Sequence, residues 1–99
     1  MTEYMSYFKF LTDTKSIIND FKIDMKCEAF SGEAFDKAYN AFLRKLVQRC
    51  KEYMESSFRG QSKFIANYVS DIRGTTNYTQ LDRINKLMDI TEDYSKRAL

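Results

Sequence analysis

The chain contains no proline and only three glycines among its 99 residues, so few positions force a break in the backbone. Proline and glycine are the residues that most often end regular helices. Gly32, Gly60 and Gly74 each lie between segments whose apolar residues recur at helical spacing. No stretch of useful length shows the apolar–polar alternation of a half-buried strand. The sequence therefore predicts an all-α, three- to four-helix bundle around one long central helix.

The composition predicts a single helical domain over residues 1–99. Apolar residues make up 43% and charged residues 30% of the chain, which is typical of folded rather than disordered proteins. A chain of this length forms one domain by its size alone. No linker, internal repeat or low-complexity tract interrupts it.

Hydropathy gives no indication of a membrane. No apolar run approaches the roughly 18 residues that a spanning helix needs. The first residues also lack a basic segment followed by an apolar one, which a signal peptide would have. We therefore expect a protein without membrane contact in the cytoplasm, either of its host or of an infected cell.

The clearest helix covers about residues 32–59. Apolar residues follow one another there at steps of four and three, as Phe35, Tyr39, Phe42, Leu46, Cys50 and Tyr53. Phe42 and Leu46 occupy the middle of this stripe, and we expect both to anchor the core. Gly60 is a natural stop. The alternative is that Gly60 lies inside a longer helix, because glycine costs a helix only about 1 kcal/mol relative to alanine.

Three further helices are predicted on the same grounds. The first covers about residues 4–25, with a weak point at 12–14, where hydroxyl and carboxylate side chains compete for backbone hydrogen bonds. The next runs over 62–73. The last begins after a polar turn, where Asn77 and Gln80 have the spacing of a capping box.

The chain offers little for catalysis. It has no histidine, its acids are scattered along polar helix faces, and its two cysteines, Cys27 and Cys50, form no CxxC motif. Cys50 lies on the apolar stripe, which favours core packing over a reactive thiol. Cys27 lies beside a predicted turn about 28 Å from Cys50 along the helix, too far for a disulfide. We expect no enzyme, no metal and no cofactor.

The most functional-looking feature is a run of positive charge without an intervening acid. It comprises Lys37, Arg44, Lys45, Arg49 and Lys51. Lys37, Arg44 and Lys51 have heptad spacing and so share a helix face, which Tyr39 and Tyr53 could flank. We expect these cations to contribute little to folding. The face is ordinary solvated surface, or binds an acidic protein, or binds phosphates of a nucleic acid or nucleotide.

Two weaker candidates lie elsewhere. Arg73 opens the polar turn 73–79, which is either a plain turn with a helix cap or an anion site at a helix N-terminus. Tyr4, Tyr7 and Phe8 crowd the start of the chain, where aromatic rings either fill the core or contact another chain.

These features together predict a small non-catalytic interaction or regulatory protein, an inhibitor or adaptor that binds a protein partner through a helix face. The alternative is a nucleic-acid or phosphate-ligand binder that uses the basic face. A homo-oligomer is compatible with either function.

Overall fold

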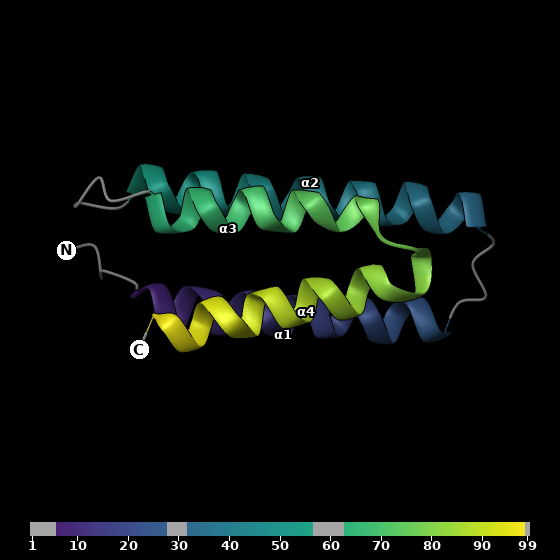
Figure 1. Ribbon diagram of the computed structural model, residues 1–99, viewed down its shortest axis with the longest axis horizontal. Helices are drawn as coiled ribbons and strands as arrows, with labels where there is room; N and C mark the ends of the chain where they lie inside the picture. Colours follow the sequence, from purple (N-terminus) through teal and green to yellow (C-terminus); the bar gives the residue numbers. More distant parts are fainter. Residues whose placement is uncertain (1–5, 28–31, 57–62, 99) are drawn as a thin grey trace.

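The computed structural model describes residues 6–27, 32–56 and 63–98, and these form four α-helices and one short 3₁₀ helix (Figure 1). The elements are α1 (Tyr7–Cys27), α2 (Gly32–Ser56), α3 (Lys63–Arg73), η1 (Gly74–Asn77) and α4 (Gln80–Arg97). The described ranges contain no β-strand. The predicted all-α class and the predicted bundle of three to four helices are confirmed, with four α-helices in the described residues.

The helices form two layers, with α2 beside α3 in one and α1 beside α4 in the other (Figure 1). Consecutive helices run in opposite directions, which is the up-down-up-down topology of simple bundles. The longest helix is α2, as predicted, at 25 residues or about 37 Å. Its described part ends at Ser56. Whether Gly60 interrupts a longer helix concerns residues 57–62, which lie outside the described residues.

The predicted break at residues 12–14 is wrong, because α1 continues through them without interruption. Thr14 is fully buried, and its hydroxyl donates to the Phe10 carbonyl oxygen one turn earlier at 2.8 Å. The side chain therefore finds its hydrogen bond inside the helix and does not compete with the helical backbone.

The predicted capping box at the start of α4 is also wrong. Asn77 belongs to η1, and Thr79 precedes the first turn of α4, where its carbonyl oxygen accepts from the amide groups of Asp82 and Arg83. The Gln80 side chain reaches instead to α2, where its amide donates to the Gly32 carbonyl oxygen at 2.9 Å. Gln80 thus joins the starts of two helices.

The core is rich in aromatic rings. Leu46 is 2% exposed, which confirms it as a core anchor, whereas Phe42 is only partly buried. The Phe42 ring packs on Phe21 of α1 with their centroids 4.1 Å apart. Phe42 therefore closes the edge of the core between α1 and α2 and does not lie at its centre.

Two tyrosines are the largest fully buried side chains, and each hydroxyl has a threonine partner on another element. The Tyr68 hydroxyl lies 2.7 Å from the Thr91 hydroxyl of α4, and that of Tyr39 lies 2.5 Å from Thr75 of η1. Each threonine hydroxyl also donates to a backbone carbonyl oxygen earlier in the chain, that of Ile72 for Thr75 and that of Leu87 for Thr91. The tyrosine is therefore the donor in both pairs.

Leu46→Ala should lower the free energy of unfolding by about 2–5 kcal/mol, since it leaves a cavity in a close-packed core. Ile23→Ala on α1 is the control, because Ile23 is 50% exposed and its truncation should cost less than about 0.5 kcal/mol. Chemical denaturation of the two variants gives the comparison. Equal losses would mean that the stripe on α2 does not face the core.

Thr91→Val should destabilise the protein more than Tyr68→Phe. The valine leaves the Tyr68 hydroxyl buried without its partner, at a cost of about 1–3 kcal/mol. The phenylalanine leaves Thr91 bonded to the Leu87 carbonyl oxygen and should cost about 1 kcal/mol. Denaturation of both single variants and the double variant measures the coupling. A double variant whose loss is the sum of the two single losses would contradict the pairing.

Candidate functional site

The predicted basic stripe divides around α2, because five cations spaced by one to seven residues point in several directions at 100° per residue. Arg49 faces α1, where its Nε donates to the Thr14 hydroxyl at 3.2 Å and its guanidinium lies 4.7 Å from the centre of the Phe10 ring. This position corrects the expectation that Arg49 contributes little to folding. It is a structural link between α1 and α2.

Two other cations of the stripe stay in solvent. Lys37 lies 3.7 Å from Glu33 in an exposed pair one turn apart. Lys45 is exposed, and no described residue forms an ion pair or hydrogen bond with it. Neither lysine lines the two cavities between α2 and α3.

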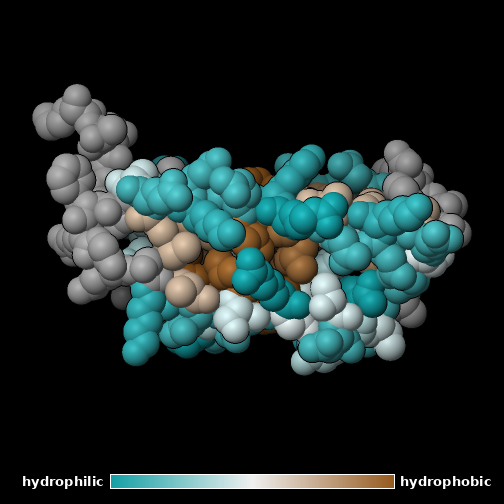
Figure 2. Space-filling model, turned by 90° about the horizontal axis from the view of Figure 1, so that it is seen from above, coloured by the Kyte–Doolittle hydropathy of each residue, from teal (hydrophilic) through white to brown (hydrophobic). Residues whose placement is uncertain are grey.

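The remaining two, Arg44 and Lys51, meet Arg73 of α3 in a groove between α2 and α3. One cavity of about 440 Å³ is lined by Asn40, Leu43, Arg44, Val47, Gln48, Lys51 and Arg73. A second cavity of about 290 Å³ is lined by Lys51, Met54, Ala66, Val69, Ser70 and Arg73. The two cavities adjoin, because Lys51 and Arg73 line both, and we refer to them together as the α2–α3 groove. Figure 2 looks onto this face and shows apolar atoms bordered by hydrophilic side chains.

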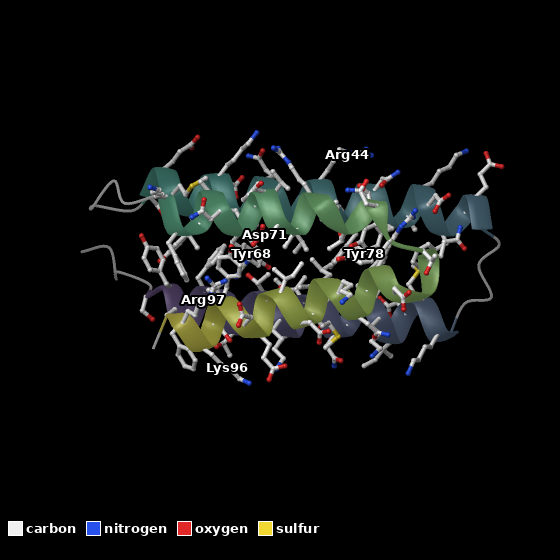
Figure 3. All side chains as sticks on the ribbon, in the orientation of Figure 1. Arg44, Tyr68, Asp71, Tyr78, Lys96 and Arg97 are labelled. Atoms are coloured by element: carbon white, nitrogen blue, oxygen red, sulfur yellow. The ribbon has the colours of Figure 1, made fainter. Side chains whose placement is uncertain are left out.

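The rim of the α2–α3 groove is positively charged and unneutralised. No described lining residue is acidic. Arg44, Lys51 and Arg73 are exposed, and none of them forms an ion pair with any described residue. In Figure 3, Arg44 lies on the outer side of the α2–α3 layer, whereas Arg97 lies toward the space between the layers. Arg97 pairs with Asp93 at 2.9 Å.

The floor of the groove is aliphatic. Leu43 and Val47 are each 7% exposed and Val69 is 8% exposed, so the floor is the outer edge of the core. No described lining residue is aromatic. The prediction that Tyr39 and Tyr53 flank the basic face is wrong, since both rings are buried on the core side of α2.

The turn after α3 is a structural element. Thr75 of η1 is fully buried, and its hydroxyl bonds Tyr39 and the Ile72 carbonyl oxygen. These contacts support the plain-turn interpretation of residues 73–79. Arg73 belongs to the α2–α3 groove and not to an anion site at the start of α4.

The N-terminal aromatic residues have different surroundings. Tyr4 lies outside the described residues. Tyr7 packs against Tyr53 and Phe64, with ring centroids 5.9 and 5.2 Å away, and so takes part in the intramolecular core. Phe8 is 40% exposed, so part of its ring is available to solvent.

Burial keeps the Cys50 thiol and the hydroxyls of Tyr39 and Tyr68 neutral. Burial raises the pKa of the Cys50 thiol to about 11, and it also raises the pKa of Tyr39 and Tyr68. Cys50 is a free, fully buried thiol, which agrees with the predicted absence of a Cys27–Cys50 disulfide. A neutral buried thiol is a poor nucleophile. The described residues contain no group of three or more potential ligands that could hold a metal ion.

Sequence reasoning missed much of the groove lining, including Asn40, Gln48, Met54 and Ser70. One available signal was the spacing of Ala66, Ser70 and Arg73, which places two small residues and a cation on one face of α3. That face borders the apolar stripe of the same helix, as the groove requires.

Comparison of the chain with protein-family models, curated proteins and solved structures gave no significant match. Within the part of the chain that the structure describes, no helix combines the length and apolar character needed to cross a membrane.

The protein should lose stability as the pH rises above about 9. The pKa of Cys50 rises from 9.0 in the unfolded chain to about 11 in the fold, so the unfolded chain releases its proton first. The unfolded state then binds fewer protons, and the free energy of unfolding falls with increasing pH. The stabilisation that comes from the neutral Cys50 thiol is complete below pH 9 and is lost by about pH 11. The raised pKa values of Tyr39 and Tyr68 extend the loss above pH 10.

Thermal unfolding between pH 7 and pH 11 measures this effect. We expect a constant Tm up to about pH 8.5 and a continuous decrease beyond it. A Tm that is unchanged at pH 11 would show that these groups ionise equally well in the folded state.

Proposed function

We propose that this is a non-catalytic interaction protein that binds an acidic partner protein in the α2–α3 groove. One observation supports this function above the others. Three cations without partners among the described residues border a groove with an aliphatic floor and no described acidic lining residue. Such a site offers a partner both apolar contact and charge complementarity.

The charge arrangement favours binding over folding. Three like charges at one groove repel one another, although weakly, because the groups are exposed and solvent screens them. Carboxylates from a partner would remove this repulsion and accept charge-assisted hydrogen bonds from the arginine and lysine groups. The cations are exposed, so they would also speed the encounter with an acidic surface.

Nucleic acid fits the groove less well, although it was the alternative function. Proteins that bind single strands combine basic grooves with aromatic rings on which bases stack. The described lining residues are aliphatic, small or polar, and Tyr39 and Tyr53 are buried away from the groove. The role of inhibitor or adaptor and the cytoplasmic location stay predictions.

Replacing Arg44, Lys51 and Arg73 together with glutamine should abolish partner capture from a lysate of the native host. The Tm should stay the same or rise slightly. The change removes the repulsion between the three cations, and it breaks no ion pair among the described residues. Capture should be measured by pull-down at low and high salt, before and after nuclease treatment. We expect to recover an acidic protein. Nuclease treatment should leave its recovery unchanged, and high salt should reduce it.

The matched control replaces Lys26, Lys45 and Lys63 with glutamine. These lysines are exposed, lie outside the α2–α3 groove and give the same change in net charge. The proposal fails if both triple variants lose the partner equally, since net charge would then explain binding. It also fails if the captured partner is a nucleic acid or a second copy of this chain.

A further inference from the structure

The shape of the α2–α3 groove indicates what part of the partner enters it. We infer that the occupant is a single amphipathic helix of about four turns, with one carboxylate opposite Arg44 and another between Lys51 and Arg73. This inference rests on the proposed function and specifies the structure and charge pattern of the partner.

The length of the groove sets the length of the occupant. Its lining on α2 extends from Asn40 to Met54, which is about 21 Å at 1.5 Å per residue. An α-helix of that length contains about 14 residues, or four turns. The lining on α3 is shorter, from Ala66 to Arg73, so α2 provides most of the contact.

The walls favour a helix over an extended peptide. An extended segment binds by adding a strand to the edge of a sheet, where free backbone groups accept it. Both walls here are helices, whose interior backbone groups bond within the helix. An amphipathic helix satisfies its own backbone and needs only an apolar face toward Leu43, Val47 and Val69.

The positions of the cations set the spacing of the acids. Arg44 and Lys51 are seven residues apart on α2, or about 10.5 Å along its axis. A helix lying along α2 would therefore match them with two acidic residues seven positions apart. Lys51 and Arg73 line both cavities, so the acid at that point faces two cations. This pair should determine specificity more than Arg44 does.

Designed peptides can test the occupant without knowledge of the natural partner. The first peptide has 14 residues, capped ends, leucines at helical spacing and two glutamates seven positions apart. The second replaces both glutamates with glutamine. The third has the composition of the first, but its leucines alternate as in a strand. Each is titrated into the isotopically labelled full chain while backbone amide NMR shifts are followed.

We expect the first peptide to shift amides of α2 and α3, and the second to bind at least tenfold more weakly, because it loses charge-assisted hydrogen bonds. The third should leave these amides unshifted. In the Lys51→Gln/Arg73→Gln variant, the preference for the first peptide over the second should fall severalfold. Arg44→Gln should reduce it less.

Equal binding of the first and third peptides, or shifts confined to α1 and α4, would overturn the inference. Tighter binding of a single-stranded oligonucleotide at the same amides would do so too. If no designed peptide binds although the groove variant loses its natural partner, the helical occupant is wrong and the proposed function stands. Loss of that partner in both triple variants would instead remove the proposed function.

Discussion

The structure depends on hydrogen-bond partners for the hydroxyl groups of its two fully buried tyrosines. Tyr39 and Tyr68 are the largest fully buried side chains, and a hydroxyl left unpaired in a core costs about 1–3 kcal/mol. Their partners, Thr75 and Thr91, lie on elements that follow α3 in the chain. Shifting α2 or α3 along its axis by one residue would separate these pairs. Hydrophobic burial alone is tolerant of such shifts, whereas the hydrogen bonds select one register.

The α2–α3 groove follows from that register. Tyr39 holds η1 against α2 through Thr75, and Thr75 in turn bonds the Ile72 carbonyl oxygen at the end of α3. Arg73 is the next residue. Its position at the groove is therefore fixed by the buried hydrogen bonds of Thr75, two residues away. The candidate site lies on regular helices that the core holds in place, which suits a surface that must present several groups at once.

Periodicity in the sequence predicts the helices and the core well. The stripe on α2 identifies Leu46 and Cys50 correctly, because a buried helix face needs apolar residues every three or four positions. Predictions from local side-chain chemistry are less reliable, since the helix break expected at residues 12–14 and the capping box expected at Asn77 are both wrong. Threonine can bond its own helix as well as break it, and the choice depends on whether its side chain faces the core, as that of Thr14 does.

The site could be predicted only in part. Heptad spacing correctly places Arg44 and Lys51 on one face of α2. It says nothing about which neighbour borders that face, so the contribution of Arg73 depends on tertiary packing. The same limit explains Arg49, whose charge looks free in the sequence but lies against Thr14 and Phe10 of α1.

The distribution of ion pairs separates the groove from ordinary surface. Among the described residues, no ion pair includes a residue from 40 to 56 or from 63 to 73, while pairs occur on α1, on α4 and at the start of α2. Exposed cations cost little when unpaired, so their presence alone would not indicate a function. The aliphatic floor adds the second requirement of a binding surface. A partner there would gain steering and selectivity from the charges, while the apolar contact would set how long it stays bound.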